Sequence, residues 1–140
     1  MSFSGQINTF VNKAKAQTVD VPRKSILELY GMIIRQTPVG HKRYWAVKRS
    51  PKGYVGGRLR NNWNLSLTNI DETTTSSTND GAASAKADQR IKSYKGHTVY
   101  LSNHLPYALR VERGHSTKQA PHGMVRVSVK RWKRIVRGNI

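Results

Sequence analysis

The stretch Asn62-Trp63-Asn64-Leu65-Ser66-Leu67-Thr68 alternates polar and apolar residues. Alternation with period two is typical of a β-strand that has one buried and one polar face. We therefore predict a strand that begins near Asn62. A second alternating segment, His97 to Ser102, has Val99 and Leu101 on one face and predicts a partner strand. Together they indicate a small antiparallel sheet.

Helical spacing dominates the chain before these strands, over residues 1–36. Apolar residues recur at intervals of three and four over 5–17, and a second stripe of this kind runs from Ile26 to Ile34. Asp20 is suited to the N-cap of the second helix, which must end before Pro38. The alternative is one long helix through residue 36, kinked at its proline.

Three segments after the first strand have their own signals. Residues 71–81 are polar and of low complexity, which is typical of a flexible loop. Residues 82–91 are rich in alanine and predict a short helix. Pro106 begins another helix, which passes Glu112 and is closed by Gly114.

The C-terminal segment allows two interpretations. Its valines between 125 and 129 alternate as in a strand, but the apolar residues between 125 and 136 also recur with helical spacing. We expect an extended segment followed by a helix over 129–137 that stops at Gly138. The predicted fold is a single α+β domain over 1–140, with its α+β core over 58–140. Its small antiparallel sheet is packed by an N-terminal helix or helix pair and by a C-terminal helix.

The chain is strongly basic, with 25 Lys+Arg against 7 Asp+Glu and a formal net charge of +18. Self-repulsion of this size destabilises an isolated compact chain, so we expect an anionic partner. The charge concentrates in a long inserted loop over 40–57, which also carries aromatic residues, and in the C-terminal tail. The candidate DNA- or partner-facing residues are Lys42, Arg43, Lys48, Arg49, Lys52, Arg58, Arg60, Arg126, Lys130, Arg131, Lys133 and Arg134.

Catalytic signatures do not emerge from the sequence. Without cysteine there is no disulfide, thiolate catalysis or Cys-based zinc site. The histidines lack metalloprotease spacing, the serines lie in no Gly-x-Ser-x-Gly turn, and the glycines form no phosphate-binding pattern. We therefore predict a protein that is not an enzyme and has no cofactor or metal. No apolar stretch has the roughly 18–20 residues of a membrane span, and no signal peptide is evident.

Short motifs in a fixed order link the chain to a known family. They are Thr37-Pro38-Val39, Gly57-Arg58-Leu59-Arg60-Asn61-Asn62-Trp63, Asn103-His104-Leu105-Pro106-Tyr107-Ala108, Val111-Glu112-Arg113-Gly114-His115 and Gln119-Ala120-Pro121-His122-Gly123-Met124-Val125. This combination resembles the HK97 gp10-like family of tailed-phage neck and tail-completion proteins. The motif residues expected to be structural are Pro38, Gly57, Leu59, Trp63, Asn103, Pro106, Tyr107, Ala108, Glu112, Gly114 and Pro121. Compact members lack the insertion found here at 40–56.

The resemblance implies a structural virion protein, made in the host cytoplasm, that forms a homo-oligomeric ring at the head–tail junction. Such a ring contacts neighbouring connector and tail proteins, and DNA passes through its lumen with transient, nonspecific attraction; no membrane is involved. The alternative function is a nonspecific nucleic-acid-binding packaging or chaperone factor. A third is an HNH-like nuclease, for which Asn103-His104 is the only signal.

The motif residues also have physical roles that do not depend on the family. Gly56-Gly57 permits a turn into a strand that begins near Arg60, and Trp63 fixes that strand to the core. Tyr107 and Ala108 pack the helix begun by Pro106 on the sheet. Glu112, a rare acid among bases, pairs with an arginine in the same subunit or in a neighbour.

Overall fold

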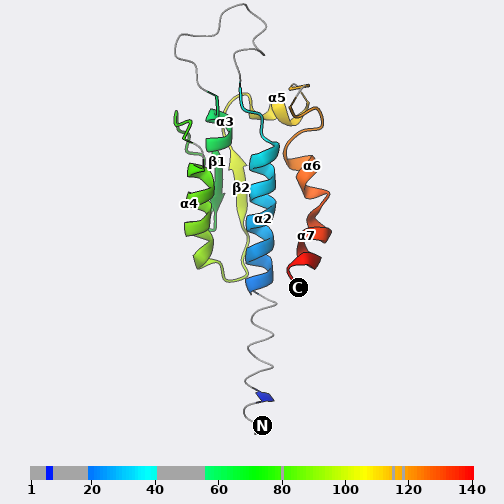
Figure 1. Ribbon diagram of the computed structural model, residues 1–140. Coiled ribbons are helices and arrows are strands. Elements are labelled where there is room, and N and C mark those ends of the chain that lie inside the picture. The colour runs from blue at the N-terminus through cyan, green and yellow to red at the C-terminus, as the bar shows by residue number, and fades with distance from the viewer. Residues whose placement is uncertain (1–5, 8–18, 41–55, 80, 115, 118) are drawn as a thin grey trace, which may run out of the picture.

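The computed structural model describes residues 6–7, 19–40, 56–79, 81–114, 116–117 and 119–140. A two-stranded antiparallel sheet packs against helices, so the predicted α+β class is confirmed (Figure 1). Strand β1 (Trp63–Ser66) pairs with β2 (Tyr100–Asn103), placing Trp63 opposite Asn103 and Ser66 opposite Tyr100. Both strands fall where the alternation predicted them, although each is shorter than its alternating segment.

The start of β1 differs from the prediction because a helical turn precedes it. Helix α3 (Arg58–Asn61) occupies the residues expected to enter the strand, and Gly57 stands at its N-cap with φ of 113°. The amide side chains of Asn61 and Asn62 donate to the main-chain oxygens of Gly57 and Arg58, at 3.0 and 2.7 Å. These side-chain bonds stabilise a closed turn in place of an extended chain.

Helix α2 (Val21–Gln36) ends before Pro38, as predicted, and buries Ser25, Tyr30 and Ile33. Asp20 stands at its N-cap, but its side chain caps no main-chain N–H group. The backbone of Asp20 is already helical, with φ −70° and ψ −41°, whereas a capping side chain needs a non-helical backbone. The Asp20 carboxylate lies 3.6 Å from Arg23 instead. Most of the helix expected over 5–17 lies outside the described residues.

Helix α4 (Ala82–Arg90) confirms the alanine-rich prediction and continues into a 3₁₀ turn, η3 (Ile91–Ser93). Helix α5 (Ala108–Glu112) begins two residues after Pro106, and Gly114 follows it with φ of 91°. Of the two residues expected to pack this helix on the sheet, Ala108 is buried, whereas 39% of Tyr107 is exposed. Packing comes from three buried residues spaced three apart on one face: Leu105, Ala108 and Val111.

The C-terminal segment forms two helices separated by a turn at 130–131, so the extended segment expected before the last helix is wrong. Helix α6 (Val125–Val129) and helix α7 (Trp132–Gly138) follow one another and pack on α2 (Figure 1). The Ser128 hydroxyl, which is fully buried, donates to the Met124 main-chain oxygen at 2.8 Å within α6. Ile135 fixes α7 to the core, and α7 ends at Gly138, where the helix was expected to stop.

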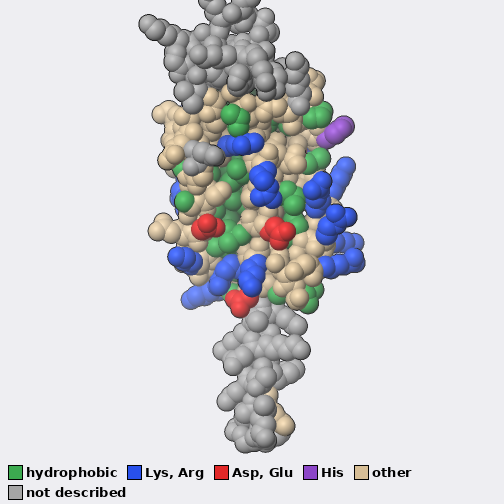
Figure 2. All heavy atoms as spheres, viewed as in Figure 1, with side chains coloured by type: hydrophobic (Ala, Val, Ile, Leu, Met, Phe, Trp, Pro, Cys, Tyr) green, Lys and Arg blue, Asp and Glu red, His purple; other side chains and the backbone are tan. Residues whose placement is uncertain are grey.

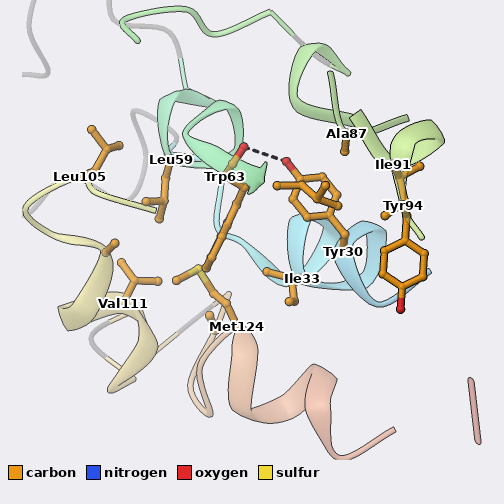
Figure 3. Packing of buried hydrophobic residues seen from close by; sticks show 13 residues of the cluster. Tyr30, Ile33, Leu59, Trp63, Ala87, Ile91, Tyr94, Leu105, Val111 and Met124 are labelled. Carbon is orange, nitrogen blue, oxygen red and sulfur yellow. Dashed lines mark hydrogen bonds between the residues drawn. The ribbon is translucent and has the colours of Figure 1, made fainter. Parts of the chain in front are cut away.

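The hydrophobic core lies where α2, α4 and β1 meet. Figure 3 shows Tyr30 and Ile33 of α2, Trp63 of β1 and Ile91 after α4 around this centre, with Met124 just before α6. The Tyr30 hydroxyl donates to the main-chain oxygen of Trp63 at 2.7 Å. Burial raises the pKa of Tyr30 well above its usual value, so this hydroxyl stays a neutral donor. A polar bond thereby ties α2 to β1 inside an apolar cluster.

Residues 71–79 form no helix or strand, yet two buried asparagines of the β1 region hold them. Asn62 accepts from the main-chain N–H of Thr75 at 2.8 Å and donates to its oxygen at 2.9 Å. Asn64 donates to the main-chain oxygen of Thr73 at 2.9 Å. The Thr73 hydroxyl, and after it Arg90, lowers the pKa of Asp71 well below its usual range. The part of the loop nearest the sheet is therefore fixed by side chains.

Candidate functional site

The motif segments, far apart in the sequence, meet at the C-terminal end of α2. Thr37 is fully buried there; its hydroxyl donates to Ile33 at 2.7 Å and accepts from the Trp63 indole at 2.8 Å. Arg60 donates to the main-chain oxygens of Thr37 and Arg35 at 2.7 and 3.2 Å. The first motif is therefore joined to the second through Thr37. We call this group of contacts, together with those described next, the motif junction.

Two amide side chains extend the motif junction to the later motifs. Gln119 accepts from the main-chain N–H of Val39 at 2.9 Å and donates to the Val39 oxygen at 2.8 Å, as a paired strand would. Asn103 donates to the main-chain oxygen of Leu59 at 2.9 Å and accepts from Leu105 at 3.2 Å. The first and second motifs are each bonded to a motif much later in the chain.

The inserted loop begins and ends at a single point of the motif junction. Gly40 and Gly56 flank it, and a Cβ atom on Gly56 would overlap the main-chain oxygen of Gly40 and come within 2.7 Å of Val39. Only glycine permits this approach at position 56. The two motifs that the insertion interrupts in the sequence therefore meet at Gly40 and Gly56.

Glu112 confirms the predicted pairing with an arginine, within the same chain. Its carboxylate lies 3.3 Å from Arg126 and accepts main-chain N–H groups of Met124, Val125 and Arg126 at 2.7–2.9 Å. Partial burial alone raises the pKa of Glu112, but the three N–H donors and the Arg126 charge outweigh it and lower that pKa. Glu112 thus satisfies the free N–H groups at the start of α6.

Two glycines allow this closure between α5 and α6. Gly123 has φ of 90°, and a Cβ atom there would lie 2.5 Å from the main-chain oxygen of Glu112. Gly114 has φ of 91°, and a Cβ atom there would lie 2.6 Å from the oxygen of Pro121. Each position combines a left-handed backbone with a close approach that only glycine tolerates. The later motifs therefore form the tight connection between α5 and α6.

The candidate basic residues separate into three groups. Lys42, Arg43, Lys48, Arg49 and Lys52 lie outside the described residues. Three have side chains that bond within the chain: Arg58 donates to Thr75, Arg60 donates to the end of α2, and Arg126 pairs with Glu112. The remaining four are exposed on or between α6 and α7, together with Arg137 of the same basic tail: Lys130, Arg131, Lys133, Arg134 and Arg137. Figure 2 shows Lys and Arg side chains gathered on this side of the molecule.

Sequence reasoning missed the polar residues that organise the motif junction. Thr37 and Gln119 lay inside quoted motifs without a role, and Asn62 and Asn64 counted only as the polar side of a strand. The one available signal was the pair of asparagines flanking Trp63, since buried amides need partners on both their oxygen and nitrogen atoms. Their partners lie elsewhere in the chain and only folding identifies them.

Metal and membrane features are absent from the residues that the structure describes. No group of three His, Asp or Glu side chains lies close enough there to hold a metal ion. His104 and His122 are exposed, and the ring of His97 lies 5.6 Å from that of Tyr94. None of the described helices has the length and apolar character needed to cross a bilayer.

The chain matches no protein-family model, no curated protein and no solved structure.

Proposed function

We propose that this chain is a structural subunit of a tailed-phage head–tail junction, which assembles with further copies into a ring through which DNA passes. The observation that carries this proposal is the motif junction. The segments that resemble the neck and tail-completion family bond to one another, through Thr37 to Trp63, Val39 to Gln119 and Asn103 to Leu59. Such residues maintain a scaffold.

The mechanism that we propose is assembly through surfaces carried by this scaffold. The residues that flank the insertion over 41–55, Gly40 and Gly56, lie in contact with one another on this scaffold. The exposed cations of α6 and α7 form a second surface on an element packed against α2. Charged surfaces of this kind steer encounter and suppress wrong partners more than they add affinity. The chain supplies contact and position in this proposal, and no bond-making step.

A phage mutant lacking this chain tests the proposal by negative-stain microscopy of its particles. We expect filled heads and separate tails, and normal joined particles when the wild-type chain is supplied in trans. Light scattering of the purified chain is expected to show an assembly of several copies. Mutant particles with heads joined normally to tails would overturn the assignment.

The second candidate is a nonspecific nucleic-acid-binding factor that acts in packaging and leaves before the particle is complete. The exposed cations on α7, which make no bond to the described residues, favour it. Mass spectrometry of purified virions separates the two candidates, because a neck subunit stays in the particle and a packaging factor does not.

A further inference from the structure

Five exposed cations on the α6–α7 side form what we call the cationic face: Lys130, Arg131, Lys133, Arg134 and Arg137. None of their side chains makes a hydrogen bond or an ion pair with the part of the chain that the structure describes. Residues 113–140 contain eight Lys and Arg and no Asp or Glu. The cationic face therefore has no nearby acid in the sequence to neutralise it.

Three acids of the described chain bond to groups outside the cationic face. Asp71 pairs with Arg90 at 2.7 Å and Glu112 with Arg126. Glu28 of α2 accepts from Asn139 at 3.1 Å, beyond the last turn of α7. Arg58, Arg60 and Arg126 show that this fold can satisfy arginines internally, whereas the five side chains of the cationic face remain exposed.

Repulsion between the like charges of the cationic face destabilises the folded chain, and no acidic side chain offsets it among the described residues. Lys133 and Arg137 stand four residues apart on α7, a spacing at which like charges on a helix repel. Ile135 is buried and packs α7 on α2, so these side chains project from a fixed element. An anion bound across the face would relieve this repulsion.

The composition of the face favours a phosphate backbone over an acidic protein. Protein interfaces are enriched in aromatic residues, methionine and arginine but depleted in lysine, and the cationic face includes Lys130 and Lys133. Here Trp132 is half-buried, and Val129 is the exposed apolar residue beside the cations. Lys133 to Arg137 spans about 6 Å of helix, which is close to the advance of two base pairs along the axis of a DNA duplex, at about 3.4 Å each. Sequence-independent attraction to phosphates needs only such charge.

We propose that the cationic face binds the phosphate backbone of duplex DNA without recognising its sequence. This inference deepens the proposed function and rests on it for the source of the DNA, which is the genome that passes through the ring. Because each contact is an exchange of counterions, the attraction is dispersed and the DNA can slide.

The test is DNA affinity as a function of salt for the full-length chain, with a short fluorescent duplex of mixed sequence. Arg134→Gln with Arg137→Gln removes two charges from the cationic face. The matched control, Lys92→Gln with Lys95→Gln, removes two exposed charges after α4. We expect the first variant to lose about 1.8 from the slope of log K against log salt, at about 0.9 per phosphate contact. The control should lose less than half as much.

Equal slopes for the two variants would overturn the inference, provided that circular dichroism shows both to be folded. A second result would also overturn it. If the Arg134→Gln, Arg137→Gln variant binds DNA as the wild type does but is no longer incorporated into virions, the cationic face binds an acidic protein neighbour. The proposed function is tested separately. If the chain is absent from wild-type virions but the two variants still differ in slope as expected, the inference about DNA binding stands and the assignment to the neck is wrong.

Discussion

The indole nitrogen of Trp63 donates a hydrogen bond to the hydroxyl of Thr37, 2.8 Å away, and both residues are buried. Thr37 follows the last residue of α2 and Trp63 begins β1, with the whole insertion between them in the sequence. The bond thus fixes the helix to the strand at the base of the insertion, and the stability of this link can be tested directly.

Replacing Thr37 by Val keeps the shape of the side chain and leaves the Trp63 N–H group buried without an acceptor. We expect a loss of about 1–3 kcal/mol in the free energy of unfolding, since an unsatisfied buried donor carries its full desolvation penalty. Urea denaturation measures it. Thr37→Ser retains the hydroxyl and is expected to lose less, and a Val variant as stable as the wild type would contradict the role given to this bond.

Glu112 predicts a pH dependence of stability. Its pKa is lower in the folded chain than in the unfolded one, so its contribution is complete above the unfolded value of about 4.3. The contribution is lost as pH falls from there through the folded pKa. Thermal unfolding from pH 7 to pH 3 should show a steeper acid loss for the wild type than for Glu112→Gln. Parallel curves for the two proteins would show that the carboxylate is not the capping group.

Gly123 and Gly81 form a matched pair for testing the corner between α5 and α6. Both have a left-handed backbone, with φ of 90° and 81°, but a Cβ atom at Gly81 would meet nothing within 4 Å. Gly81→Ala is expected to cost only the backbone strain, about 1–2 kcal/mol. Gly123→Ala should cost more, because its methyl group would press on Glu112. Urea unfolding compares the two, and equal losses would mean that the close approach contributes nothing.

The insertion should be removable without unfolding the domain. Because Gly40 and Gly56 are in contact, a short Gly-Ser-Gly linker in place of residues 41–55 can join them without strain. Shortening a loop about fivefold lowers its closure entropy by about 1 kcal/mol, so the variant should be as stable as the wild type or slightly more. Calorimetry tests this expectation. A much lower melting temperature would show that the insertion packs on the domain.

The local sequence pattern was sufficient to predict those elements whose structure depends on their own residues. The alternation around Trp63 and Leu101 located both strands, and the alanine-rich segment located α4. The pairing of Glu112 with an arginine was also predicted, because an isolated acid in a basic chain requires a partner. These inferences depend on spacing and charge, which the sequence contains in full.

Position within the fold decided the remaining cases. Tyr107 was expected to pack with Ala108 on the sheet, but the buried face of this region follows Leu105, Ala108 and Val111, and 39% of Tyr107 is exposed. Residues 125–129 became helical because Glu112, more than ten residues earlier, supplies acceptors for the N–H groups at the start of α6. The residue pattern within 125–129 contains no information about a hydrogen-bond acceptor at position 112, so it could not decide between strand and helix.

The sequence by itself determined an α+β domain with a strong positive charge and a set of ordered motifs, since periodicity, charge and residue order need no coordinates. Only the tertiary structure decided which cations are available to a partner. Arg58, Arg60 and Arg126 are taken up by carbonyls and a carboxylate that folding brings to them, whereas Lys133 and Arg134 find no acceptor among the described residues. Long-range hydrogen bonds, invisible to local pattern, separate the cations that stabilise the fold from those that face outward.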